Sequence, residues 1–377
     1  MEEQLYQACK DGKVEEVQKL LQNEQININW QNQNDYLQTP FYIACGKGHI
    51  EIVKLLFNDN RIDINKAEND GWTPFHIVCK KGDTKIVKLL LNDNRIDINK
   101  AEEDGRTPFH SACREGYIEI VKLLLNDNRV DINKGDNYSE TSFYDACQKG
   151  HIDIVKLLLN DERIDINKAR NDGYTPFHIA CSEGRTEIVK LLLNDERIDI
   201  NKANDDGITP LYVACYYERT EIVKLLLNDK RVDINKAINK AGNDYYGKGF
   251  TPFHIACCEG YIEIVKLLLN DNRLDINKAD NDGSTPFYRA CYFGKTEVVK
   301  YLLESEREID INKKDNNGKS GLDYAKQKGN THIVKLIESF QKNPICKNST
   351  NLFIIYKLFF IFFILFFKII NKVRNHN

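Results

Sequence analysis

A block of about 34 residues recurs along most of this chain, and the repetition constrains the fold more than any other feature. One copy spans residues 171–204 and reads NDGYTPFHIACSEGRTEIVKLLLNDERIDINKAN, and almost the same letters occur before and after it. A unit of this size cannot bury its apolar face alone, so neighbouring units must stack to share one continuous core. We therefore expect an elongated array in which each unit contacts mainly the next.

Each block has the signals of two short helices followed by a hairpin. Thr175 before Pro176 is typical of a helix N-cap followed by a proline in the first helical position. A second helix is expected over residues 186–194, where the apolar side chains cover an arc wide enough to meet both a partner helix and the next block. The alternation in residues 198–200 indicates an extended arm, and the Asp-Gly pair that follows indicates a tight turn.

The phrases TPFH, EIVKLLL and DIN, at this order and spacing, resemble the ankyrin repeat. The resemblance implies an all-α ankyrin-repeat solenoid over residues 1–340, with helix-turn-helix plus hairpin in each repeat and a role in protein–protein binding. One departure is NDERIDIN, which has an extra residue where the family usually has a glycine-containing turn. Ten repeats are expected, with first helices aligned at Leu5, Phe41, Phe75, Phe109, Phe143, Phe177, Leu211, Phe253, Phe287 and Leu322.

Eleven cysteines would suggest redox chemistry if nine did not share one helix position, where the family favours alanine. Repeats stack roughly 8–10 Å apart, beyond the ~7 Å Cα separation that a disulfide tolerates. Buried free thiols fit a reducing compartment, and no signal peptide precedes Leu5, so we expect cytoplasmic or nuclear repeats. The nine are Cys9, Cys45, Cys79, Cys113, Cys147, Cys181, Cys215, Cys257 and Cys291.

The charge balance argues against nucleic acid as a partner. All six charged residues after residue 340 are basic, which leaves 47 basic and 56 acidic residues in the repeats. An acidic solenoid lacks the clustered Lys and Arg that a phosphate backbone requires. We expect a monomer that binds protein partners.

No motif assigns a chemical step to this chain. His76, His110, His178 and His254 each precede a cysteine by three residues, but a zinc site needs about four converging ligands, and we expect these histidines to be structural. The run from Gly242 resembles a P-loop but has glycine where Ser or Thr is required. We therefore predict no enzyme activity, no cofactor, no metal and no small-molecule substrate.

Two segments depart from the repeat. An eight-residue insertion lies near residues 238–249, inside a hairpin. After a polar linker at 341–351, residues 352–370 are apolar except for two lysines and a tyrosine hydroxyl. This segment resembles a C-terminal tail anchor, which would leave the repeats in the cytoplasm, and it nearly spans the ~30 Å hydrocarbon core. The alternatives are an apolar segment folded onto the last repeat or an aggregation-prone, non-native extension.

Candidate binding residues follow from the family, whose partners usually dock on the concave face of hairpin tips and first-helix ends. The residue after the turn glycine varies between repeats, and aromatic residues gather before the helix-ending glycine and in the insertion. Drift explains the first pattern nearly as well, and adaptation of repeat 7 to the insertion is the alternative for the second. The candidates are Trp72, Arg106, Tyr174, Tyr216, Tyr217, Tyr245, Tyr246, Tyr292 and Phe293.

These patterns predict a non-catalytic scaffold or adaptor. The alternative is a structural tether that links a membrane to cytoskeleton or other machinery through residues 352–370. An enzyme would need chemistry from the insertion or the tail, because the repeat pattern supplies none.

Overall fold

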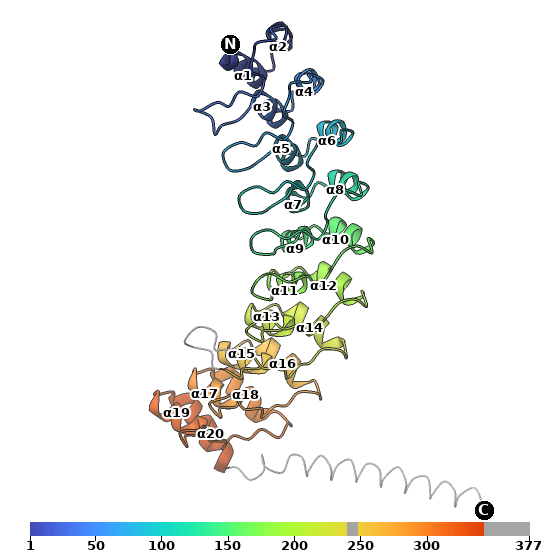
Figure 1. The fold of residues 1–377 in the computed structure, drawn as a ribbon. Helices are drawn as coiled ribbons and strands as arrows, with labels where there is room; N and C mark the ends of the chain where they lie inside the picture. Colours follow the sequence, from blue (N-terminus) through green and yellow to red (C-terminus); the bar gives the residue numbers. More distant parts are fainter. Residues whose placement is uncertain (240–247, 343–377) are drawn as a thin grey trace, which may run out of the picture. The chain divides into compact units, whose positions relative to one another are not determined.

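A computed structural model describes residues 1–239 and 248–342 of the chain (Figure 1). All regular structure in these residues is helical, apart from three isolated β-bridges at the hairpins. This confirms the predicted all-α stack of helix pairs. The chain forms two compact units, residues 1–205 and 206–377, which are described separately. The expected anchor at 352–370 lies outside the described residues.

Odd-numbered helices form one row in each unit and even-numbered helices form the other, and the long hairpin loops project from the odd-numbered side (Figure 1). We call the two rows inner and outer helices. In the first unit the helices are α1 Glu2–Asp11, α2 Val14–Leu21, α3 Pro40–Lys47, α4 Ile50–Phe57, α5 Pro74–Lys81, α6 Thr84–Leu91, α7 Pro108–Glu115, α8 Ile118–Leu125, α9 Ser142–Lys149, α10 Ile152–Leu159, α11 Pro176–Ser182 and α12 Thr186–Leu193. In the second unit they are α13 Pro210–Tyr216, α14 Thr220–Asn228, α15 Pro252–Glu259, α16 Ile262–Leu269, α17 Pro286–Tyr292, α18 Thr296–Glu304, α19 Gly321–Gln327 and α20 Thr331–Lys342.

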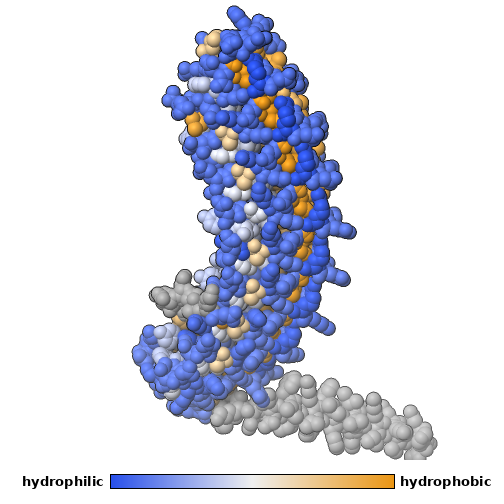
Figure 2. Space-filling model, viewed as in Figure 1, coloured by the Kyte–Doolittle hydropathy of each residue, from blue (hydrophilic) through white to orange (hydrophobic). Residues whose placement is uncertain are grey.

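The core has a similar pattern of buried residues in successive repeats. Phe177, Ala180 and Cys181 on α11 are fully buried, as are the Ile, Val and second Leu of the outer helix α12. Most of the remaining leucines of the outer helices are half-buried, and an apolar stripe follows this row in Figure 2. All nine cysteines of the shared helix position are buried and free, as predicted, because adjacent copies are one repeat apart.

The Thr-Pro-Phe-His phrase builds the start of an inner helix and ties it to the next repeat. In α7 the Thr107 hydroxyl accepts a hydrogen bond from the His110 N–H, and His110 Nδ1 accepts one from the Thr107 N–H at 3.1 Å. His110 Nε2 therefore carries the proton and donates to the carbonyl oxygen of Glu140 at 3.0 Å. This confirms the structural role predicted for these histidines.

In most repeats, the asparagine that ends the DIN phrase joins successive hairpins. The Asn133 side-chain amide donates to the carbonyl of Arg163 at 2.7 Å, and its oxygen accepts from the Asp165 N–H at 2.9 Å. These contacts satisfy backbone groups that no β-sheet covers. The same pair of bonds is made by Asn29, Asn65, Asn99, Asn167, Asn235 and Asn277.

The segment NDERIDIN and its equivalents in other repeats, such as NDNRVDIN at residues 126–133, contain an arginine clamp. The Arg129 guanidinium pairs with Asp127 two residues earlier at 2.6 Å and donates to the carbonyl of Leu91 at 3.0 Å, at the end of the preceding outer helix. Carbonyls in the last turn of a helix have no partner within the helix, so the arginine of one repeat caps the outer helix of the repeat before it.

Candidate functional site

In each unit, hairpin tips lie beside the inner helices, and we call the surface that the tips form with the C-terminal ends of these helices the inner face of that unit. The contact is direct in repeat 3, where Lys80 Nζ lies 4.3 Å from the centre of the Trp72 ring. In repeat 9, Arg289 on α17 pairs with Asp280 and Asp282 of its own hairpin. Within a repeat, these contacts place the hairpin beside the inner helix.

The predicted tip residues are only partly available to a partner. Trp72 is half-buried and packs on His76 with ring centres 5.6 Å apart, and Tyr174 packs on His178 at 5.2 Å. Arg106 reaches into the next hairpin, where its Nε lies 3.4 Å from Asp136. The tip side chains therefore also contact the inner helix of their own repeat or the hairpin of the next one.

In the second unit the tip position contributes less surface. Ser284 is buried, although it belongs to the variable tip positions. Phe250, which occupies the equivalent place before α15, is also buried and stacks on His254 with ring centres 5.2 Å apart. The tip position is thus half-buried at Trp72 and Tyr174 and buried at Ser284 and Phe250.

The aromatic residues at the inner-helix ends form two pairs in the second unit. Tyr216 and Tyr217 lie edge to face with ring centres 4.9 Å apart, and Tyr217 is 50% exposed. Glu218 follows with φ 56°, in the left-handed region where most other repeats place glycine. Tyr292 and Phe293 form the second pair at 5.0 Å, and both are half-buried.

Tyr324 extends the second pair and was not among the predicted binding residues. Its ring centre lies 5.3 Å from that of Tyr292 and 5.2 Å from that of Tyr288. The amino group of Lys328 lies 4.9 Å from the Tyr292 ring centre. Tyr324 occupies the place of Arg289 in the preceding repeat, so aligning the last repeat position by position would have revealed it.

Two exposed tyrosines at hairpin tips were also missed. Tyr36 is 68% exposed and Tyr138 is 58% exposed. Ser139 follows Tyr138 with φ 63°, in place of the usual turn glycine, and this substitution is the signal that marks the irregular hairpin. Tyr245 and Tyr246 of the insertion lie outside the described residues.

The irregular fifth repeat holds a buried ion pair. Asp145 on α9 is fully buried, and its carboxylate lies 3.0 Å from the Arg114 guanidinium. Burial raises the pKa of Asp145 to about 6, although Arg114 acts in the opposite direction. Its second carboxylate oxygen has no hydrogen-bond partner among the described residues. The pair fixes the Arg114 side chain at the end of α7.

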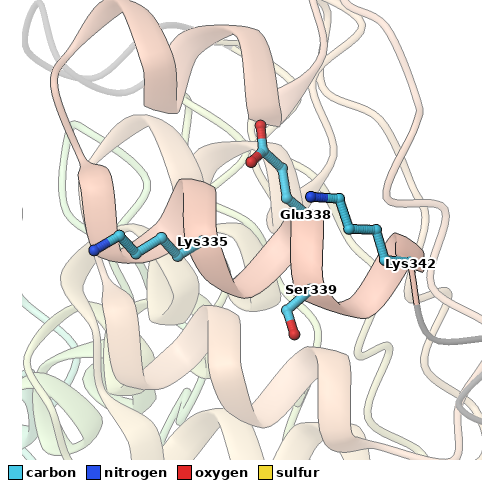
Figure 3. Close-up of a pocket in the computed structure, with 4 residues that line it drawn as sticks. All are labelled: Lys335, Glu338, Ser339 and Lys342. Atoms are coloured by element: carbon cyan, nitrogen blue, oxygen red, sulfur yellow. The ribbon is translucent and has the colours of Figure 1, made fainter.

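The described part of the chain offers no constellation for catalysis. Within residues 1–239 and 248–342, no three His, Cys, Asp or Glu side chains gather closely enough to hold a metal ion. A shallow hollow on α20 is lined by Lys335, Glu338, Ser339 and Lys342, all from one helix (Figure 3). No nucleophile there is paired with a base, and Glu338 is bonded to Lys326 at 2.9 Å. No helix within the same residues is long and apolar enough to cross a bilayer.

Stacked helix pairs with projecting hairpins define a solenoid repeat protein. Family models described as ankyrin repeats match residues 20–78, 61–136, 94–169, 143–238, 197–280, 236–315 and 253–351. The chain therefore belongs to the ankyrin repeat family. No curated protein matches the chain. Ankyrin repeats form protein–protein interaction domains and are typically non-catalytic, so a protein partner is indicated for this chain.

Proposed function

We propose that this protein is a non-catalytic scaffold or adaptor that binds a partner protein on its inner face. The observation that carries the proposal is the exposed Tyr217 ring, held beside Tyr216 at the end of α13. Tyrosine supplies a large contact area with few rotatable bonds, which is why it is enriched at interface hot spots. In this proposal the chain is monomeric and its repeats are cytoplasmic.

The surroundings of the aromatic pairs support this site. The rings of Tyr292 and Tyr324 and the cation of Lys328 lie together on the inner face of repeats 9 and 10. Aromatic side chains bordered by a cation can bury apolar surface and pair with an acidic or π-rich partner. We therefore favour a binding role over a purely local adaptation.

The test is affinity capture with the full chain, compared with a variant carrying Tyr216→Ala, Tyr217→Ala, Tyr292→Ala and Phe293→Ala. Loss of several hot-spot rings should weaken the captured partner at least about 100-fold, since each such residue contributes roughly 1–2 kcal/mol or more. Tyr301→Ala, which truncates a half-buried aromatic residue on an outer helix, serves as the control. Circular dichroism checks that all variants remain helical. A partner retained by the fourfold variant would contradict the aromatic site.

A second proposal concerns tethering, and it rests on the apolar composition of residues 352–370. Such a segment would hold the repeats at a membrane while their inner face binds a partner. Deleting residues 352–377 should then release the protein from the membrane fraction and leave partner capture intact. Extraction of the undeleted chain by alkaline carbonate would contradict the tether without affecting the adaptor proposal.

A further inference from the structure

The inner face of the first unit carries exposed lysines that have no carboxylate partner. Lys47, Lys81 and Lys149 occupy the last position of α3, α5 and α9, each directly before the glycine that ends the helix. All three are exposed, and no acidic side chain among the described residues lies within 4.0 Å of their amino groups. Lys80 lies beside them over the Trp72 ring.

Several lysines on the outer helices, by contrast, form ion pairs. There Lys54, Lys122, Lys156 and Lys190 each pair with an acidic residue three positions earlier, at 2.6–3.9 Å. Repeats 2, 4, 5 and 6 thus pair an outer-helix lysine with an acidic residue, whereas Lys88 of repeat 3 has Lys85 three positions earlier and no acidic side chain within 4.0 Å among the described residues. At the last position of the inner helices, α3, α5 and α9 have lysine, whereas α1 has Asp11 and α7 has Glu115. A lysine at a helix C-terminus also interacts favourably with the helix dipole, so charge alone does not define a ligand.

The spacing of the inner helices is similar to the length of one turn of an extended peptide. The inner helices α3, α5, α7 and α9 pack successively against one another, at roughly 8–10 Å per step. A polyproline II segment has three residues per turn and a rise of about 3.1 Å per residue, so every third side chain recurs on one side at about 9 Å. One turn of such a segment therefore matches one repeat.

The register contains one interruption. On α7 the position equivalent to Lys47 and Lys81 is Glu115, which is exposed. A segment lying along the four helices would meet lysine, lysine, glutamate and lysine in turn. Carboxylates are therefore suited to its first, fourth and tenth positions, and a neutral or basic residue is suited to its seventh.

We propose that the inner face of the first unit binds an extended acidic protein segment with this three-residue spacing. The proposal rests on the inner face being the binding face, as in the proposed function, but it uses different residues. Protein is favoured over nucleic acid because Asp70, Glu103 and Asp104 are exposed at the hairpin tips of the same repeats. A uniformly charged phosphate backbone would be repelled there, whereas a peptide can place neutral side chains at these points.

The test uses fluorescence anisotropy with the full 377-residue chain and two labelled, proline-rich twelve-residue peptides of identical composition. One has glutamate at positions 1, 4 and 10, and the other has the glutamates in consecutive positions. The variant K47Q/K81Q/K149Q should bind the spaced peptide about tenfold more weakly, from three partly exposed ion pairs. The matched control K54Q/K88Q/K156Q changes the outer-helix lysines of the same three repeats and should alter binding less than about twofold.

A charge reversal tests the register itself. Glu115→Lys should strengthen binding of a peptide with glutamate also at position 7 by about threefold or more, and it should leave the original spaced peptide less affected. Equal binding of the spaced and clustered peptides would overturn the proposal, as would equal losses in the two lysine triples or no binding at millimolar concentration. Tighter binding of a single-stranded oligonucleotide, lost in K47Q/K81Q/K149Q, would assign the surface to nucleic acid instead.

The two proposals fail separately. The fourfold aromatic variant changes only residues of the second unit and should bind the spaced peptide as the unaltered chain does. Loss of the captured partner in that variant, with peptide binding intact, supports both proposals. Peptide binding that vanishes with the aromatic residues and survives K47Q/K81Q/K149Q would overturn the lysine site alone.

Discussion

Buried histidines make the folded state sensitive to acid. Burial lowers the pKa of His76 and His110 to about 4, from the usual value near 6.5, and it lowers the pKa of His254 further. The folded protein holds these rings neutral, whereas the unfolded chain binds a proton as the pH falls below 6.5. The stability that these neutral histidines contribute is therefore fully present above pH 6.5 and is lost as the pH falls toward 4.

His110→Gln tests this contribution. Between pH 7 and pH 5, one such histidine should account for about 2 kcal/mol of the fall in unfolding free energy, as urea titrations at each pH would measure. Glutamine cannot take up the proton, so the variant should lose less stability over this range, even if it is about 1–3 kcal/mol less stable at pH 7. His332→Gln, at an exposed position, should leave the pH dependence unchanged. An identical slope in all three proteins would contradict this account.

Protonation of Asp145 changes the unfolding free energy in the opposite direction, so it reduces the loss of stability that the histidines cause as the pH falls. Burial raises its pKa to about 6, so the folded state binds this proton more tightly than the unfolded chain does. Its contribution to stability is present at low pH and is lost as the pH rises through 6. The comparison of His110→Gln with the unaltered chain cancels this term, because Asp145 is present in both.

Among the elements, the outer helices depend on the arginine of the following repeat. Arg129 joins the carbonyls of Leu91 and Asp93 to the Asp127 carboxylate, and equivalent arginines recur along the array. The sequence showed an extra residue at this place but not its purpose, because the capped carbonyl lies 38 residues earlier. Local patterns report caps within one helix and miss those supplied by a neighbour.

Arg129→Ala should destabilise the fold by about 1–2 kcal/mol, the lower part of the range for hydrogen bonds to charged groups, since the side chain is one-third exposed. Arg129→Lys should recover less than half of this loss, because an ammonium group cannot reproduce the planar, bidentate contact. Lys122→Ala, which removes an exposed pair with Glu119, should change stability by less than about 0.5 kcal/mol. Thermal unfolding measures all three, and equal shifts for Arg129→Ala and Lys122→Ala would contradict the clamp.

At the scale of the whole molecule, the stacking could be predicted because each helix carries its own boundary signals. Thr175 and Pro176 mark where α11 begins, and the buried cysteine column follows from the repeat. The inner face was harder to predict, because exposure depends on side-chain direction and on partners one repeat away. Trp72 turns onto His76, and Arg106 reaches Asp136 in the next hairpin. Neither contact can be obtained from spacing.

Stacking of this kind also predicts which repeats a destabilising substitution affects. Each inner helix packs on the inner helices beside it, and each outer helix does the same, so every repeat in a unit is supported mainly by its neighbours. Leu124 is fully buried on α8, and Leu124→Ala should cost about 2–5 kcal/mol through the cavity it leaves. In hydrogen exchange, the loss of protection should be greatest in repeat 4 and should decline within one or two repeats on either side.

Leu268→Ala on α16 is the matched control, because it removes the equivalent buried leucine in the second unit. Its loss of protection should centre on repeat 8 and leave α5 and α6 unchanged, while Leu124→Ala should leave α17 to α20 unchanged. In a nearest-neighbour array, local opening costs less than unfolding the entire chain, so exchange reports the position of the defect. The same increase throughout the described residues in both variants would show that the array unfolds as one cooperative body, and the nearest-neighbour account would then be wrong.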